Sequence, residues 1–184
     1  PPPPPPPPPL FFFHADPAIR DPLWSRGLGD VYKRQPSQYA IDVSERKALS
    51  VWRKHKDCAV ISGDTIIDFD SRIIGKPKSD KEAFTMIKKL SGKKHYVISA
   101  LSLIIDGNIN TIFDKSSVIF NKLRDADIHQ YISSFDILDK AGAYNIEECA
   151  DILIKNIDGC YHNIVGFPVK KFENSNMEES LKNL

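Results

Sequence analysis

The stretch SGDTIIDFDSRIIGKP, residues 62–77, sets polar side chains between apolar runs. An apolar run at 58–61 leads into Asp64 and Thr65, and a second apolar run follows them. Runs of β-branched residues bounded by small and polar residues predict strands. The Gly-Lys-Pro sequence around Lys76 then predicts a turn. We therefore expect Asp64 and Thr65 at the end of a buried strand, with Lys76 returning to the same place after a hairpin.

The remaining pattern predicts an α/β domain. Helical spacing of apolar residues and capping signals mark the helices, and β-rich runs between turn residues mark the strands. Helices are expected over 37–54, 79–91, 125–133 and from 176, strands over 58–61, 65–69, 96–105, 109–113, 117–120 and 152–157, and 163–172 is ambiguous. Asp106-Gly107 is a strong hairpin signal. Because hairpins interrupt the alternation of strands and helices, we expect a mixed sheet.

Composition and charge restrict the class of protein. The chain has 184 residues, enough for one domain or at most two, with 25 basic and 24 acidic residues. This balance disfavours a nonspecific nucleic-acid partner, which would face a patch of one sign. Three cysteines without metal spacing fit a reducing cytoplasm. No segment has the length and hydropathy of a membrane span.

The first 35 residues differ from the rest in composition. Residues 1–9 are all proline, and residues 10–35 show neither a helical nor a strand period. We therefore expect 1–35 to be a non-native or disordered leader, an artefact of the sequence, and 36–184 to be the folded domain.

Charged and polar residues gather where the predicted elements end. Lys47, Lys76 and the loop at 91–95 offer positive charge and backbone donors, which suit a polyphosphate. Asp64 offers a hard oxygen ligand for Mg²⁺ and a base for water. Each of these also has a purely structural explanation. Lys47 can be a solvated lysine on a helix, Asp64 can be a carboxylate in a turn, and the loop at 91–95 can be an ordinary helix C-terminus. Taken together they favour a metal-assisted hydrolase of phosphate esters or anhydrides, although neither a P-loop nor a dinucleotide-binding motif is present.

Six short motifs follow one another along the chain: ERKAL, SGDTII, GKP, LSGKKH, DKAGAY and DGCYHNIVGFP. In this order the chain resembles the Maf family, the septum-formation-type nucleoside triphosphate pyrophosphatases, over about residues 36–169. The resemblance implies a fold like that of inosine-triphosphate pyrophosphatases: an elongated, twisted mixed sheet flanked by helices, with a central cleft between two lobes. It also implies a homodimer that cleaves dTTP, UTP or modified nucleotides to monophosphate and pyrophosphate with Mg²⁺ or Mn²⁺.

The same resemblance implies roles for individual residues. Asp64 matches the proton acceptor that activates water, or a carboxylate beside the metal. Lys47 and Lys76 match lysines that hold phosphate oxygens, and Thr65 matches a position that helps to set base specificity. Glu147 stands where the family has a glutamine that contacts the base. Because an amide both donates and accepts whereas a carboxylate only accepts, the base preference stays open.

Other departures from the family pattern leave the activity open as well. The Ser-x-Ser-Pro-Arg-Arg loop and a following acidic pair have no counterpart, so the domain is expected to lack its first strand and phosphate loop. Ser99-Ala100-Leu101 replaces the usual Thr-Gly-Val. We expect a pyrophosphatase that cleans the nucleotide pool. The alternatives are a noncatalytic nucleotide-binding or division-regulating member of the same fold, and an inactive truncated fragment.

Overall fold

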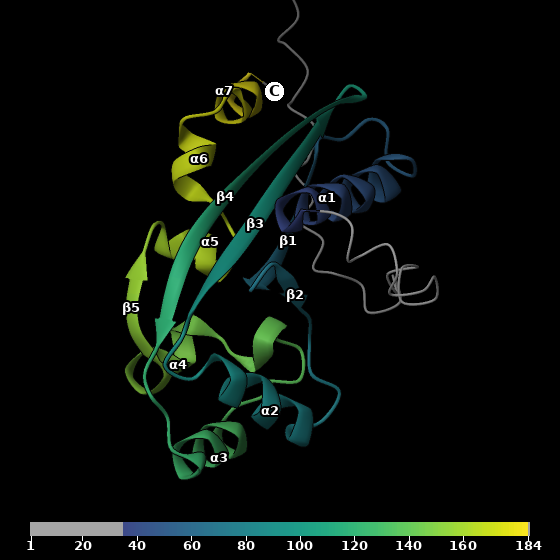
Figure 1. The fold of residues 1–184 in the computed structure, drawn as a ribbon. Coiled ribbons are helices and arrows are strands. Elements are labelled where there is room, and N and C mark those ends of the chain that lie inside the picture. Colours follow the sequence, from purple (N-terminus) through teal and green to yellow (C-terminus); the bar gives the residue numbers. More distant parts are fainter. Residues whose placement is uncertain (1–34, 184) are drawn as a thin grey trace, which may run out of the picture.

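The computed structural model describes residues 35–183 (Figure 1). Apart from Gln35, the expected leader lies outside the described residues. The helices are α1 (Pro36–Trp52), α2 (Asp80–Leu90), α3 (Asp125–Ser134), η3 (Ala141–Ala143), α4 (Ile146–Leu153), α5 (Tyr161–Val165), α6 (Val169–Glu173) and α7 (Asn176–Lys182). The strands are β1 (Val60–Phe69), β2 (Arg72–Ile74), β3 (Lys94–Ile105), β4 (Asn108–Phe120) and β5 (Ile154–Asp158). The α/β class is confirmed.

The five strands form one sheet in the order β2-β1-β3-β4-β5, and every neighbouring pair is antiparallel. The expectation of a mixed sheet is therefore wrong for the described residues. A parallel pair needs a crossover, whereas here β1 ends beside the start of β3, and β4 ends beside the start of β5. Two-residue turns close the β1–β2 and β3–β4 hairpins, and their residues, Asp70-Ser71 and Asp106-Gly107, all have the positive φ that such turns require.

Strand β1 runs without a break through the polar residues of the opening stretch. Backbone pairing with β3 continues from Val60 opposite Ile104 to Asp68 opposite Tyr96. This pairing satisfies the backbone groups around Asp64 that point toward β3, so a glycine and an aspartate do not end the strand. The expected break between two strands is wrong, and Asp64 lies in the middle of β1.

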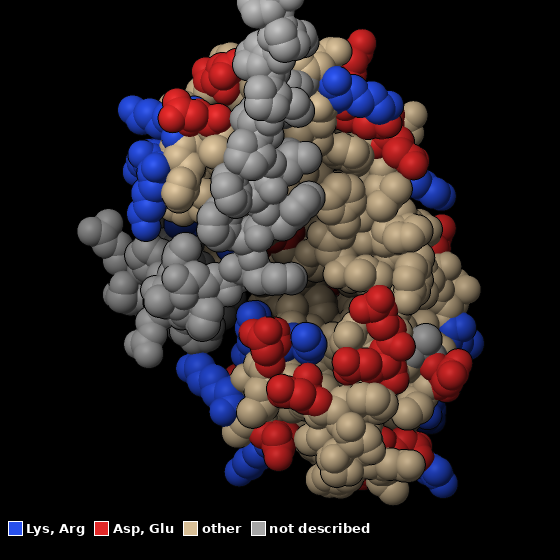
Figure 2. Space-filling view, turned by 180° about the vertical axis from the view of Figure 1, so that it is seen from behind, with Lys and Arg blue, Asp and Glu red and all other residues tan. Residues whose placement is uncertain are grey.

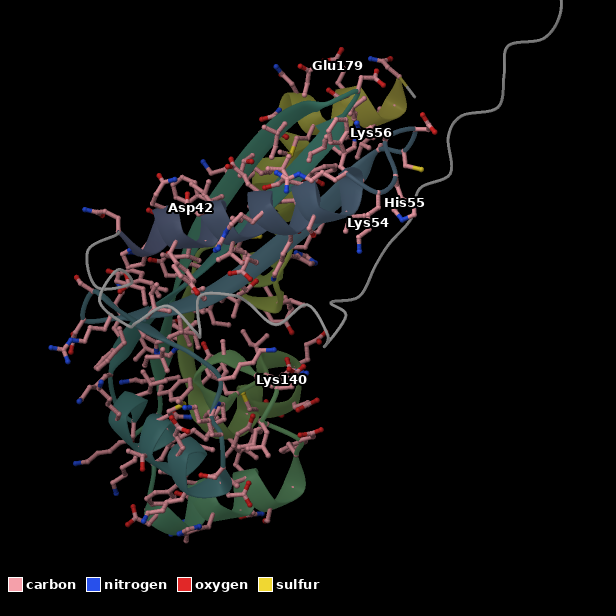
Figure 3. All side chains as sticks on the ribbon, turned by 90° about the vertical axis from the view of Figure 1, so that its right-hand side faces the viewer. Asp42, Lys54, His55, Lys56, Lys140 and Glu179 are labelled. Carbon is pink, nitrogen blue, oxygen red and sulfur yellow. The ribbon has the colours of Figure 1, made fainter. Side chains whose placement is uncertain are left out.

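Helix α1 covers one face of the sheet, and α6 and α7 cover the other face near the β3–β4 turn (Figures 1 and 3). On the α1 side, Ala40 packs against Ile98 and Ala100, both of which are buried. On the opposite side, Met177 packs against Leu101 and Leu103. Even and odd positions of β3 therefore face different helices, as the period of two in a strand requires.

The other end of the sheet packs against a larger hydrophobic cluster that α2, α3, η3 and α4 share. Helix α2 begins at the expected cap: the Ser79 hydroxyl accepts from the Glu82 backbone N–H at 3.3 Å. Helices α2, α3, η3 and α4 thus gather at one end of the sheet and α6 and α7 at the other, and the surface is hollowed between them (Figure 2).

The C-terminal part follows the sequence pattern with shifted boundaries. The ambiguous segment 163–172 contains most of α5 and α6, which are separated by a turn at Gly166 with a φ of +126°. The expected strand at 152–157 begins only at Ile154, because the residues before it complete α4. Helix α7 is present, and the Ser175 side chain caps it by accepting from the Met177 backbone N–H. No helix within residues 35–183 combines the length and hydropathy that a membrane crossing requires.

Candidate functional site

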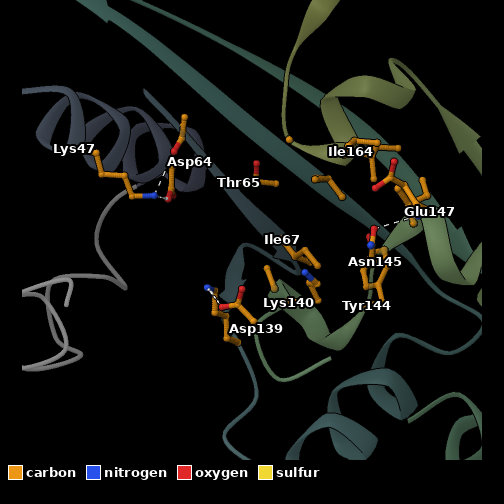
Figure 4. A pocket seen from close by; sticks show the side chains of 17 residues that line it. Lys47, Asp64, Thr65, Ile67, Asp139, Lys140, Tyr144, Asn145, Glu147 and Ile164 are labelled. Carbon is orange, nitrogen blue, oxygen red and sulfur yellow. Dashed lines mark hydrogen bonds and ion pairs between the residues drawn. The ribbon is translucent and has the colours of Figure 1, made fainter. Parts of the chain in front are cut away.

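A pocket of about 470 Å³ opens beside the middle of β1 (Figure 4). Its lining residues come mainly from α1, β1, the connection from β2 to α2, the segment from Asp139 into α4, and the end of α5. Every site residue expected from the sequence lines it: Lys47, Asp64, Thr65, Lys76 and Glu147. The structure therefore brings these residues together, while their individual roles stay predictions.

Asp64 and Thr65 are neighbours in the chain but lie on opposite faces of the sheet. Asp64 pairs with Ala100 on the face that α1 covers, and Thr65 pairs with Ser99 on the other face. Among the described residues, β2 pairs with β1 only from Ile67 onward, so no described strand covers the outer edge of β1 at these two residues. The pocket wraps around this edge and for that reason reaches both side chains.

Lys47 and Asp64 form an ion pair at one end of the pocket. The Nζ of Lys47 donates to Asp64 Oδ1 at 2.6 Å and to the backbone oxygen of Gly63 at 3.3 Å. One turn earlier on α1, the buried Ser44 hydroxyl donates to the Ser62 backbone oxygen at 3.0 Å and lies 2.7 Å from Ser102 Oγ. These bonds fix α1 to β1 and β3, so Lys47 is held over the strand that carries Asp64.

A second ion pair lies across the pocket, between Lys76 and Asp139 at 2.5 Å (Figure 4). The hydrogen bond from Lys76, with help from the charge of Lys140, lowers the pKa of the Asp139 carboxyl below its ordinary value. Both residues lie on connecting segments, which a backbone hydrogen bond joins, from Gly142 N–H to Gly75 oxygen at 2.9 Å. The pocket therefore has a lysine and a carboxylate on each of two sides.

The rest of the pocket wall combines apolar residues with the polar side chains of Thr65, Lys140, Asn145 and Glu147. Figure 4 shows Ile67, Tyr144 and Ile164 on the side away from Lys47, and Glu147 reaches the same region from the first turn of α4. Gly166 keeps the wall open beside Thr65, because a Cβ there would lie 3.3 Å from Thr65 Oγ1. Apolar side chains next to polar groups suit a flat heterocycle, whereas the lysines suit an anion.

Behind this wall, Tyr144 is held by a buried histidine. His95 is fully buried, its Nε2 lies 2.8 Å from Tyr144 Oη, and its ring meets Phe120 edge-on. Burial lowers the pKa of His95 to about 4 and raises the pKa of Tyr144 well above its ordinary value. Both groups are therefore neutral at pH 7, and His95 acts through the position of Tyr144.

The described residues hold no group of three or more His, Cys, Asp and Glu side chains that is arranged to bind a metal. Mg²⁺ in phosphate-binding sites commonly uses one or two carboxylates together with oxygens of the substrate. Asp64, which lines the pocket beside Lys47, fits that kind of shared site and does not fit a site built from protein ligands alone.

Sequence reasoning missed part of the pocket. Ser99, which lies behind Thr65, was noted only as a departure from a motif, and the wall at 164–166 fell in an ambiguous segment. The Gly-Phe-Pro ending of the last motif is a turn signal that marks this wall. The contact between Thr65 and Ser99 follows only from the strand register, which depends on how β1 and β3 pair.

Comparison with known proteins points to one family. The model of the Maf-like protein family matches residues 19–177. A dTTP/UTP pyrophosphatase of Clostridium botulinum (strain Okra) is 41% identical over 153 residues, covering 80% of this chain and 78% of the relative. The dTTP/UTP pyrophosphatase of the Alaska E43 strain is 38% identical over 155 residues, covering 82% and 81%. The family match begins inside the expected leader, so the leader remains a prediction.

Proposed function

The chain belongs to the Maf-like protein family, and on that premise we propose that it hydrolyses nucleoside triphosphates such as dTTP and UTP to monophosphate and pyrophosphate. The observation that carries this proposal is the composition of the pocket. Its three lysines and Asp64 suit a triphosphate and an attacking water, and the apolar residues with Thr65 suit a base.

In the proposed reaction, Lys47 and Lys76 bind the phosphate oxygens and offset the negative charge that grows on the leaving pyrophosphate. Lys47 must turn from Asp64 toward the substrate, since the two residues are paired in the free protein. Asp64 then accepts a proton from water. The water oxygen bonds to the α-phosphorus as the bond from that atom to the α–β bridging oxygen breaks, and the pyrophosphate leaves with the electron pair.

A divalent metal, Mg²⁺ or Mn²⁺, belongs to this proposal, and when bound it would neutralise charge on the triphosphate. Asp64 would share it with phosphate oxygens. In that arrangement Asp64 could serve beside the metal as well as accept the proton, since both roles require an ionised carboxylate.

The wider biological setting is proposed from the family likeness. It comprises a cytoplasmic homodimer without nucleic-acid or membrane partners, two lobes around the pocket as in inosine-triphosphate pyrophosphatases, and a part in cleaning the nucleotide pool. The arrangement of helices at the two ends of the sheet supports the two-lobed form (Figure 1).

Product analysis tests the proposed function. The chain is incubated with dTTP or UTP and Mg²⁺ or Mn²⁺, and we expect monophosphate and pyrophosphate in equal amounts. Asp64→Asn keeps the size of the side chain but removes the base, so turnover should fall by about 10³-fold. Asp151→Asn, an exposed carboxylate on α4 outside the pocket, is the matched control.

Two results would contradict the proposal. Diphosphate and orthophosphate as products would mean that another bond is cleaved. Full turnover by Asp64→Asn would remove Asp64 from the reaction. Nucleotide binding without turnover by the folded wild-type chain would instead support the noncatalytic alternative.

A further inference from the structure

Lys140 differs from the other two lysines of the pocket in having no ion-pair partner. Lys47 pairs with Asp64, and Lys76 pairs with Asp139. In the described part of the chain, the ammonium group of Lys140 forms no hydrogen bond and no ion pair. The residue lines the pocket and is half-buried. A cation that is partly removed from water without a partner is unfavourable, so it suits a site that an anion completes.

The backbone holds Lys140 near Lys76. The Gly142 N–H donates to the Gly75 oxygen at 2.9 Å, and this bond joins the two segments that carry the lysines. Asp139 interacts with both lysines: it accepts from Lys76 at 2.5 Å, and the charge of Lys140 helps to lower its pKa. Two lysines therefore share one carboxylate, and the cluster keeps a net positive charge.

The place of this cluster in the pocket bears on the direction of bond cleavage. In phosphoryl transfer, the attacking and leaving oxygens lie on opposite sides of the phosphorus, roughly in line. The proposed reaction places the attacking water beside Asp64, at the Lys47 end of the pocket. Lys76 and Asp139 lie across the pocket from Asp64, and Lys140 is on their side (Figure 4). The leaving group is therefore directed toward the two lysines.

We propose that Lys140 binds the leaving pyrophosphate together with Lys76, and that Asp139 holds the place of this anion in the free protein. The inference rests on the proposed function and assigns one of its two products to a place in the pocket. Pyrophosphate carries more charge than one lysine neutralises, so a second cation offsets the charge that grows as the bond breaks. Lys76 then exchanges Asp139 for a phosphate oxygen, and Lys140 gains a partner.

The test compares the two products as ligands. Affinities of the full chain for inorganic pyrophosphate and for UMP are measured by calorimetry with Mg²⁺. Lys140→Met keeps a long side chain but removes the charge. The affinity for pyrophosphate should fall about tenfold, and the affinity for UMP should fall by less than about twofold. A purely structural role of Lys140 would weaken the binding of both ligands alike.

Two variants serve as controls for charge and for position. Lys140→Arg keeps the charge and should keep most of the affinity for pyrophosphate. Lys155→Met removes an exposed lysine of β5 that lies outside the pocket, and it should leave both affinities unchanged.

An unchanged pyrophosphate affinity in folded Lys140→Met would overturn the inference, as would an equal loss for the two ligands. Binding of UMP without binding of pyrophosphate by the wild-type chain would overturn it too. The expected pattern without turnover of UTP refutes the proposed reaction alone, while absence of binding to either ligand refutes the reaction and the inference together.

If Lys140→Met does not fold, Asp139→Asn decides. The carboxylate then no longer competes for the two lysines, so the affinity for pyrophosphate should rise about threefold. An affinity that stays equal or falls would overturn the inference.

Discussion

The two lysine–aspartate pairs of the pocket have the same chemistry but different supports. Lys47–Asp64 joins a helix to the middle of a strand, and the side chain of Asp64 is only 15% exposed. Lys76–Asp139 joins two connecting segments, and its side chains are 57% and 76% exposed. The first pair is held by regular secondary structure. The second depends on the contacts between its two connecting segments, such as the hydrogen bond from Gly142 N–H to the Gly75 oxygen.

The difference in exposure and backbone support suits the two pairs to different roles. An exposed ion pair contributes little to stability, so Lys76 can exchange Asp139 for a phosphate at small cost. The carboxylate of Asp64 lies on a paired strand, where its position is set by the backbone of β1 and β3. A group that must face one reacting atom benefits from such rigid support, and a group that only attracts charge does not need it.

The largest effect should come from the buried His95, which contacts Tyr144 behind the apolar part of the pocket wall. Because the pKa of His95 falls from an ordinary 6.5 to about 4, the unfolded chain binds a proton between these pH values that the folded chain does not. Stability should therefore drop by about 3 kcal/mol as the pH falls from 6.5 to 4. Urea denaturation across this range measures the drop.

Two histidine variants isolate the contribution of His95. His95→Phe should remove that part of the pH dependence, because it leaves no group at this position to protonate. His129→Gln, which changes an exposed histidine, should keep it. An equal pH slope in wild type and His95→Phe would refute the assignment.

Replacing Lys47 and Lys76 in turn by methionine should lower kcat/KM by different amounts. Lys47→Met removes a phosphate ligand and the partner of Asp64, so kcat/KM should fall by about 100-fold. Lys76→Met removes a phosphate ligand that is more exposed than Lys47 and is not the partner of Asp64, so it should lower kcat/KM by only about tenfold. Steady-state kinetics on UTP measures both values, and a larger loss in Lys76→Met would reverse the interpretation.

Gly142 tests how the second pair is held in place. Its φ is +65°, and an added Cβ would lie 2.4 Å from Ile67 Cδ1. Gly142→Ala should therefore lower the free energy of unfolding by about 1–2 kcal/mol. Gly75→Ala, where a Cβ would meet nothing within 4 Å, is the matched control. Equal stability of the two variants would show that the backbone at Gly142 is not under constraint.

The smallest effect should come from Asp139→Asn. The lost ion pair is exposed, so the free energy of unfolding should change by less than about 1 kcal/mol. Thermal denaturation checks this value, and a larger loss would mean that the second pair also holds the fold together.

Local patterns in the sequence predict much of this fold. The Ser79 cap, the Asp106-Gly107 hairpin and the α/β class all follow from short-range rules and are confirmed. The continuous β1 is not predictable in this way, because pairing with β3 overrides the breaking tendency of Gly63 and Asp64. The direction of strand pairing likewise depends on where distant strands begin and end.

The candidate site shows the same division. Charge and motif spacing indicate Lys47, Asp64 and Lys76, and the structure places all three at one pocket. The sequence does not show that Asp64 and Thr65 reach it from opposite faces, since this depends on the uncovered edge of β1 within the described residues. Nor does the sequence show that Ser99 lies behind Thr65, because this contact depends on the register in which β1 pairs with β3.

The β3–β4 hairpin has a consequence for the order of folding. Its two strands pair over their whole length, from Lys94 opposite Ile119 to Ile105 opposite Asn108, and only two residues close the turn. Contacts between such near neighbours cost little loop-closure entropy and form quickly. We expect this hairpin to form early and its amide hydrogens to exchange last. Because it carries Ser99 and supplies the template for β1, the pocket would be assembled on the part of the chain that becomes ordered first.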